Sequence, residues 1–185
     1  WRTSAPIHVL WSFPWRAADR PFPLLSSPWS GLLSSCLILG DSIAIGVAAA
    51  LQILHFGGCD VLARNGASVG SIAAMAPSIG YRQVVVSAGS NDRLSPSRAR
   101  DLVTLRRKLW GAKVTWIYPR QPTPAWDVYR VARRFGDRTV DIKSAGSRDG
   151  VHPRSDIAVA RAILFQADRA NFQQSRWRSV GGTMR

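Results

Sequence analysis

The sequence predicts an α/β protein, a three-layer α/β/α sandwich around a five-stranded parallel sheet in flavodoxin-like order. Two observations lead to this fold class. Short apolar runs of strand length alternate along the chain with longer helical stretches. Several of these runs are apolar at consecutive positions, which is typical of parallel strands buried between two helix layers. With 185 residues, the chain fits one domain that has a hydrophobic core of its own.

Each element has its own signal in the sequence. The third predicted strand is the clearest, because Val84, Val85 and Val86 stand at its centre and β-branched residues favour strands. Ser95 and Pro96 suit the N-cap and first position of a helix, and Pro153 suits the first turn of another. The predicted strands are 36–39, 59–63, 83–88, 114–118 and 139–142, and the predicted helices are 42–54, 68–75, 95–110, 123–135 and 153–172.

Residues 1–35 differ from the rest in composition, with four of the eight Trp and five of the eleven Pro. The sequence therefore predicts a poorly ordered Trp/Pro-rich extension at 1–35, a folded domain at 36–173 and a basic tail at 174–185. Prolines interrupt the apolar stretch that follows Arg20, so no convincing signal peptide is present and the localisation is left open.

The chain is strongly basic. Lys and Arg total 25 against 11 acidic residues, all of them Asp, and the net charge is +14. Because the charges are scattered, the pattern favours a solvated arginine-rich surface and no specific nucleic-acid partner. A basic, non-catalytic binding protein is kept as an alternative, and the oligomeric state is not predicted.

Cysteine and histidine usage narrows the chemistry. Cys36 and Cys59 fall on neighbouring predicted strands, where either a disulfide or two buried thiols would fit, and the buried thiols are favoured. The three His are far apart and lack Cys or His neighbours at ligand spacing, so we predict no metal and no cofactor. No apolar run is long enough for a transmembrane segment.

Four short polar or glycine-containing blocks follow the predicted strands. They are Gly40-Asp41-Ser42, Gly70, Gly89-Ser90-Asn91-Asp92 and Asp149-Gly150-Val151-His152. Sites in open parallel sheets lie beyond the carboxyl ends of the strands, which is where this strand assignment places the blocks. Ser42 would expose its hydroxyl at a strand-to-helix turn, although capping the helix is the simpler role for a serine. Asp149 and His152 are the carboxylate and imidazole that a serine nucleophile requires.

The four blocks, in this order, resemble those of the SGNH (GDSL-type) hydrolase family, and the resemblance covers residues 37–153. It implies that Ser42 is the nucleophile, His152 the general base and Asp149 the residue that orients His152. The oxyanion hole would consist of the Ser42 and Gly70 N–H groups and the Asn91 side-chain amide. Gly70 is favoured over Gly66 because the family's glycine follows an asparagine by some five residues.

The resemblance implies a serine ester hydrolase. The short connections after the strands suggest an open cleft and a small, acetyl-like acyl group on a small-molecule or carbohydrate ester. Arg93, Arg120 and Trp126 are candidate substrate-binding residues, and Tyr118 and Tyr129 would extend Trp126 into a sugar-stacking wall, with ordinary packing as the simpler reading. An acyltransferase acting on a glycan hydroxyl and an inactive structural relative remain alternatives. Asp41 and Asp92 are expected to stabilise loops.

Overall fold

The computed structural model describes residues 36–56, 58–77, 80–92 and 94–165. The chain divides into two units, Trp1–Gly31 and Leu32–Arg185, and all of the described residues belong to the second. The extension predicted at 1–35, the tail predicted at 174–185 and the candidate residue Arg93 lie outside the described residues.

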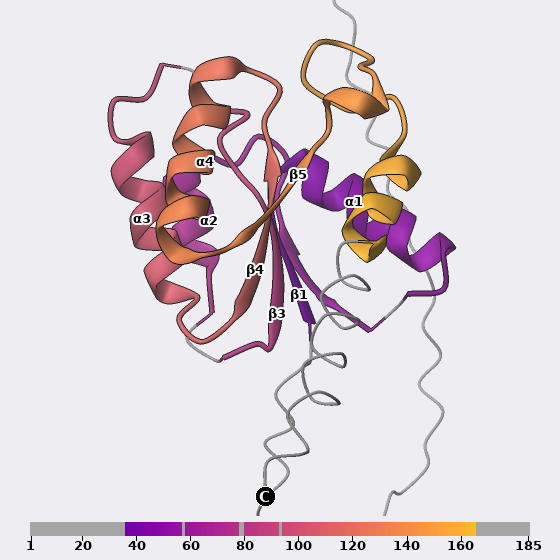
Figure 1. Ribbon diagram of the computed structural model, residues 1–185, viewed down its shortest axis with the longest axis horizontal. Helices are drawn as coiled ribbons and strands as arrows, with labels where there is room; N and C mark the ends of the chain where they lie inside the picture. The colour runs from indigo at the N-terminus through magenta and orange to yellow at the C-terminus, as the bar shows by residue number, and fades with distance from the viewer. Residues whose placement is uncertain (1–35, 57, 78–79, 93, 166–185) are drawn as a thin grey trace, which may run out of the picture. The chain divides into compact units, whose positions relative to one another are not determined.

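A five-stranded parallel sheet forms the middle layer (Figure 1). Its strand order is β2-β1-β3-β4-β5, and every pairing is parallel. This confirms the predicted five-stranded sheet and its flavodoxin-like order. The strands are β1 (Cys36–Gly40), β2 (Asp60–Ala63), β3 (Gln83–Ser87), β4 (Lys113–Tyr118) and β5 (Arg138–Asp141).

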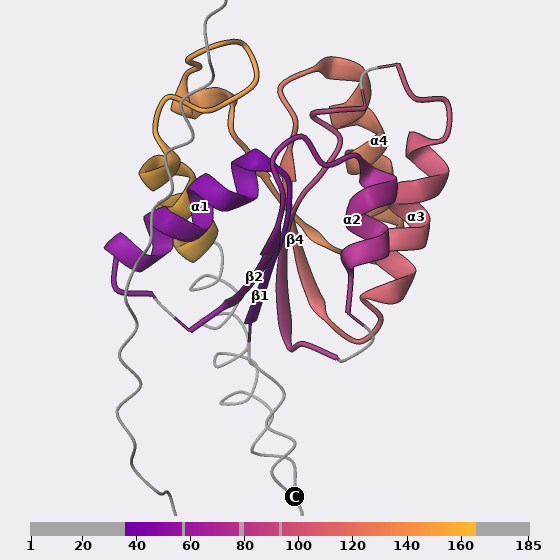
Figure 2. The same cartoon turned by 180° about the vertical axis from the view of Figure 1, so that it is seen from behind.

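Helices cover both faces of the sheet, as Figures 1 and 2 show from opposite sides. On one face lie α2 (Val69–Met75), α3 (Arg98–Lys108) and α4 (Pro122–Phe135). On the other lie α1 (Ser42–Ile53) and a helical segment at 156–165. A short 3-10 helix, η1 (Lys143–Ala145), follows β5. The three predicted layers are therefore present. No described helix is both long and apolar enough to cross a lipid bilayer.

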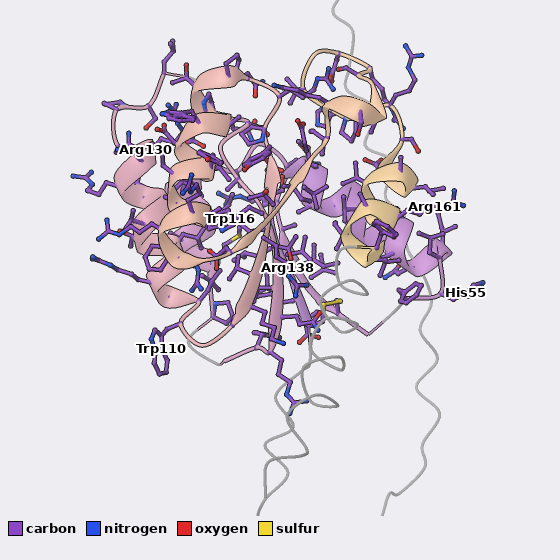
Figure 3. All side chains as sticks on the ribbon, in the orientation of Figure 1. His55, Trp110, Trp116, Arg130, Arg138 and Arg161 are labelled. Atoms are coloured by element: carbon purple, nitrogen blue, oxygen red, sulfur yellow. A yellow bond between two sulfur atoms is a disulfide. The ribbon has the colours of Figure 1, made fainter. Side chains whose placement is uncertain are left out.

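Alternation along the strands builds two cores. Leu37 and Leu39 pack under α2, α3 and α4, whereas Ile38 between them packs under α1, because successive side chains of a strand point to opposite faces. Trp116 of β4 is the largest fully buried side chain and lies in the middle of the fold in Figure 3. Its indole N–H donates to Asp137 Oδ2 at 2.9 Å, so the one polar group of the ring is satisfied.

Two predicted helix starts are wrong. Helix α3 begins at Arg98, with Ser97 in the N-cap position. Ser95 lies in the turn before it, where its carbonyl accepts from the Arg98 N–H at 3.4 Å and its hydroxyl bonds Ser97 Oγ at 3.1 Å. The last helical segment begins at 156, after Ser155 Oγ accepts from the Ala158 N–H. Residues before it stay in the loop because the Arg154 N–H donates to Ala145 O at 3.2 Å.

The two cysteines are joined in a disulfide, so the expectation of two separate thiols is wrong. The register places Leu37 opposite Asp60, which brings the preceding residues, Cys36 and Cys59, to a Cα–Cα distance of 4.5 Å. Figure 3 shows the yellow sulfur–sulfur bond near the amino-terminal ends of the strands. The cross-link therefore lies at the opposite end of the sheet from Ser42.

Candidate active site

Ser42 is the first residue of α1, and Asp41 alone separates it from the last residue of β1, Gly40. The turn is tight: Gly40 has a φ of +152°, and a Cβ on it would lie 2.1 Å from Ser87 O on β3, so only glycine fits there. Asp41 caps the helix by accepting from the Ile43 N–H at 3.0 Å. Ser42 is thus not needed as the cap, and its hydroxyl points to another partner.

That partner is His152. Ser42 Oγ lies 2.8 Å from His152 Nε2, although the two residues are 110 positions apart in the sequence. On the other side of the imidazole, Nδ1 lies 2.7 Å from Asp149 Oδ2. With Nδ1–H donating to the carboxylate, Nε2 is left to accept the proton of Ser42. The structure therefore joins all three residues in one chain of hydrogen bonds, the arrangement that activates a serine hydroxyl.

Asp149 is held by its own loop. Its Oδ1 accepts from the backbone N–H groups of Val151 at 2.9 Å and His152 at 2.8 Å. The hydrogen bond from the His152 side chain, followed by these two backbone bonds, holds the pKa of Asp149 well below its usual range. Gly150, with a φ of +82°, makes the turn between them. Asp149 is therefore ionised and aligned even though its side chain is 52% exposed.

Further contacts fix the loop that carries His152. Ser147 Oγ and the Arg148 N–H each donate to His152 O at 3.2 Å, and the Gly150 N–H donates back to Ser147 Oγ at 2.7 Å. Arg120, which follows β4, donates to Gly146 O at 2.7 Å. The arginine thus ties the base of this loop to the neighbouring strand end.

The other two sequence blocks lie at the same edge of the sheet, after β2 and β3. Gly70 is the second residue of α2, so its N–H belongs to the first turn, where helical N–H groups have no partner within the helix. Asn91 Nδ2 donates to Ala67 O at 3.1 Å, which holds the amide beside the segment leading into α2. Both residues are exposed. Among the described residues, no backbone or side-chain acceptor pairs with the Gly70 N–H.

Comparisons with known proteins bear on this fold. No protein-family model matches the chain, and no curated protein matches its sequence. Solved structures do match. The native aryl esterase of M. smegmatis is similar with a TM-score of 0.57 and 15% identity, covering 72% of this chain and 98% of its own. A GDSL-like lipase from Bacteroides thetaiotaomicron gives a TM-score of 0.56 and 14% identity, covering 74% and 89%.

A third match is the C-terminal catalytic domain of peptidoglycan O-acetyltransferase A from Streptococcus pneumoniae. Its TM-score is 0.54 and its identity 17%, and the match covers 76% of this chain and 96% of that domain. The chain has the SGNH hydrolase fold. The three matches cover 89 to 98% of the solved chains. The structural similarity therefore extends over a complete domain and is not limited to one motif.

Charged side chains form a buried network next to the loop that carries Asn91. Asp92 is 5% exposed, and its Oδ2 accepts from the Val69 N–H at 3.0 Å, next to Gly70. Arg98 is also 5% exposed. It donates through Nη1 to Asp92 O and pairs with Asp127 of α4 at 2.7 Å. The network connects the loop after β3 with the start of α2 and with helices α3 and α4.

A second buried carboxylate lies behind the nucleophile. Asp41 is fully buried, and its Oδ1 also accepts from Ser87 Oγ at 2.8 Å. Burial raises the pKa of Asp41, and the hydrogen bonds from Ser87 and the Ile43 N–H oppose the shift without cancelling it. The sequence predicts that both carboxylates stabilise loops, whereas Asp41 caps α1 and bonds Ser87 of β3, and Asp92 bonds the first N–H of α2.

The three remaining candidates have separate environments. Arg93 lies outside the described residues, so its predicted role stays a prediction. Arg120 binds the loop carbonyl described above. Trp126 of α4 is 58% exposed and stacks on Tyr129, with ring centroids 5.2 Å apart. In the described part of the chain, no three His, Cys, Asp or Glu side chains group in a way that would hold a metal ion.

Sequence reasoning missed Arg98, Asp127 and Ser147. The first two are 29 residues apart and give no motif, so only the packing of α3 against α4 reveals the pair. A signal for Ser147 was present, because it lies two residues before Asp149 in a glycine-containing loop where a hydroxyl can bond the backbone.

Proposed function

We propose that the protein is a serine ester hydrolase with Ser42 as its nucleophile. The observation that carries this proposal is the continuous chain from Ser42 Oγ through His152 to Asp149, with distances of 2.8 and 2.7 Å. His152 takes the hydroxyl proton as Ser42 attacks the ester carbonyl, and then gives it to the leaving alcohol. Asp149 holds the imidazole in the required tautomer. Water, activated by His152, releases the acid from the acyl-enzyme.

The developing oxyanion would be bound by three N–H donors: the backbone groups of Ser42 and Gly70 and the side-chain amide of Asn91. The two backbone groups stand in the first turns of α1 and α2, where the helix dipole adds to their effect. The Asn91 amide keeps one N–H for an oxyanion while the other bonds Ala67 O. Rigid donors of this kind lower the barrier by about 3 to 4 kcal/mol each.

A small acyl group on a carbohydrate is the substrate class we favour. The His152 and Asp149 side chains are 39% and 52% exposed. This exposure supports an open site that an ester group on a large polymer can reach. The similar structures include an aryl esterase and a peptidoglycan O-acetyltransferase domain, and the name of the second refers to an acetyl group and a glycan. The first supports ester hydrolysis here and the second supports acetyl chemistry.

Acetyl transfer is the second candidate, and the similarity to the O-acetyltransferase domain favours it. The same acyl-enzyme serves both reactions, since a sugar hydroxyl takes the place of water in the second step. A donor ester is incubated with and without an oligosaccharide acceptor, and released acetate is compared with acetylated product. Hydrolysis predicts acetate in both mixtures, whereas transfer predicts product formation at the expense of acetate.

Hydrolysis of p-nitrophenyl acetate tests the proposal. Ser42→Ala and His152→Ala are each expected to lower kcat by about 10⁴-fold or more, because the nucleophile and its base work only as a pair and loss of either one removes the function of both. Ser144→Ala, an exposed serine after β5, is the matched control and should retain wild-type turnover. Wild-type turnover in Ser42→Ala would overturn the assignment. Salt-dependent DNA binding that Ser42→Ala leaves unchanged would then favour the basic binding protein.

A further inference from the structure

A shallow groove of about 310 Å³ lies beside α4 and β5, away from Ser42. We call it the aromatic groove and define it by the lining residues Tyr118, Trp126, Tyr129, Asp141 and Lys143. It gathers two of the three described tyrosines and one of the described tryptophans on one short stretch of surface. Neither the proposed reaction nor the hydrophobic core uses Trp126 or Tyr129.

Trp126 lies on the surface and not in the core. Its neighbours on α4, Val128 and Val131, are buried under the helix, whereas Trp126 is 58% exposed. The indole stacks on Tyr129 with an interplanar angle of 23°. A large apolar ring left in water costs free energy unless a ligand covers it. Stacking on Tyr129 holds the ring in one place, which reduces the entropy lost on binding.

The rim of the groove is polar and carries both signs of charge. Asp141 is the last residue of β5, and Lys143 opens η1; both side chains are exposed. The Lys143 N–H donates to Asp141 Oδ1 at 2.8 Å, which fixes the carboxylate at the edge of the groove. A carboxylate and an ammonium group together accept from and donate to hydroxyl groups.

This combination points to one ligand class. A pyranose ring has an apolar face of C–H groups that packs on aromatic rings and a periphery of hydroxyls that needs donors and acceptors. A single-stranded nucleic acid also stacks on aromatic rings, but it requires a row of cations along its backbone. Lys143 lines the groove and Arg133 donates to the Tyr129 hydroxyl at 3.1 Å, but the carboxylate of Asp141 interrupts this positive charge and repels phosphate. The groove therefore fits an uncharged sugar ring better than a nucleotide.

We propose that the aromatic groove binds a pyranose unit of the glycan chain whose ester reaches Ser42. The proposal rests on the proposed esterase function for the second half of that statement. Tyr118 and Asp141 end β4 and β5, and Ser42 follows β1, so groove and nucleophile share the carboxyl edge of one sheet. In the order β1-β3-β4-β5, the groove residues Tyr118 and Asp141 end strands that are two and three strand spacings from β1, about 10 to 15 Å at roughly 4.8 Å per strand. A short oligosaccharide spans that distance.

Trp126→Ala is the test variant and Trp110→Ala its matched control. Trp110 is 87% exposed, and Figure 3 shows it projecting at the far end of the molecule from the loop after β5. Binding of unesterified xylohexaose and chitohexaose is measured by calorimetry. Wild type and Trp110→Ala should bind at least one of the two sugars. Trp126→Ala should bind it about tenfold more weakly. Trp126→Phe should bind nearly as well as wild type, since an aromatic face remains.

Kinetics then relate the groove to the reaction. On the O-acetylated form of whichever hexaose binds, Trp126→Ala should raise KM by about tenfold over Trp110→Ala, so that the ratio of kcat/KM on the hexaose to kcat/KM on p-nitrophenyl acetate falls. A wild-type value of that ratio overturns the proposal, as does calorimetric binding of oligo-dT with no binding of either sugar. Absence of wild-type turnover on p-nitrophenyl acetate would instead remove the esterase proposal, and the calorimetry would still decide the groove.

Discussion

Asp41 and Asp149 are two carboxylates on either side of the candidate site, and their pKa values are shifted in opposite directions. Asp41 is fully buried, its carboxylate accepts from Ser87 and the Ile43 N–H, and burial raises its pKa. Asp149 is about half exposed but accepts three hydrogen bonds, and its pKa is lowered. Hydrogen bonding thus sets charge and orientation beside His152, whereas exclusion of water governs the residue behind Ser42.

The same contrast separates the two halves of the site. Asn91 and Gly70 stand above a buried network that includes Arg98 and Asp92. His152 stands on an exposed loop held by backbone hydrogen bonds and by Arg120. We therefore expect damage to the loop to lower activity with little loss of stability, and damage to the buried network to lower both.

The largest expected effect is on the exposed side. Asp149→Asn should lower kcat for ester hydrolysis by about 10⁴-fold, because an amide favours the wrong tautomer of His152. The free energy of unfolding in urea at neutral pH should fall only modestly, because the Asp149 side chain is about half exposed. Asp60→Asn, another exposed aspartate, on β2, is the control and should retain wild-type kcat. Equal kcat in the two variants would show that Asp149 does not act on His152.

The buried network should respond in stability first. Arg98→Ala leaves Asp127 without its cation and should cost about 3 to 5 kcal/mol of unfolding free energy, measured in urea. Arg100→Ala, with a side chain that is 80% exposed, should change it by less than about 0.5 kcal/mol. The double variant Arg98→Met/Asp127→Leu should recover much of the loss, since Asp127 is then no longer an unpaired carboxylate, although Asp92 O still lacks the donor that Arg98 supplied. No recovery in the double variant would mean that contacts of Arg98 other than its pairing with Asp127 make it necessary.

The sequence was sufficient for some of these features and insufficient for others. Strand order follows from alternating apolar runs, and the Ser42, Asp149 and His152 blocks follow from local residue patterns. Partners distant in sequence, such as Arg98 and Asp127, leave no local signal. The start of α3 was misplaced because Ser95 and Pro96 also suit the turn that precedes the helix, where Ser95 O accepts from the Arg98 N–H.

Gly150 tests how far the exposed loop depends on its backbone. Its φ is +82° and nothing lies near a Cβ built on it, and Gly111 at +80° is equally open, so it is a close match. Alanine at either position should cost about 1 kcal/mol of unfolding free energy. Only Gly150→Ala should also lower kcat, by about tenfold, because the turn aligns Asp149 with His152. If both variants keep wild-type kcat, the alignment does not need this turn.

The smallest effect compares the two carboxylates by pH. The folded protein holds the proton of Asp41 more tightly than the unfolded chain, because burial raises its pKa. The stability that Asp41 contributes is therefore present below its ordinary pKa of about 4 and is lost as pH rises. Asp149, with its pKa lowered, contributes stability above that pH and loses it as pH falls.

Asp41→Asn and Asp149→Asn, compared with wild type by urea unfolding between pH 3 and 8, separate the two behaviours. In Asp41→Asn, the introduced amide keeps an oxygen to accept from Ser87 Oγ, so the variant removes the titration and retains that contact. Stability of wild type relative to Asp41→Asn should fall as pH rises above about 4. Relative to Asp149→Asn, it should fall as pH drops below about 4. Parallel curves for the two variants would show that burial and hydrogen bonding do not divide the site in this way.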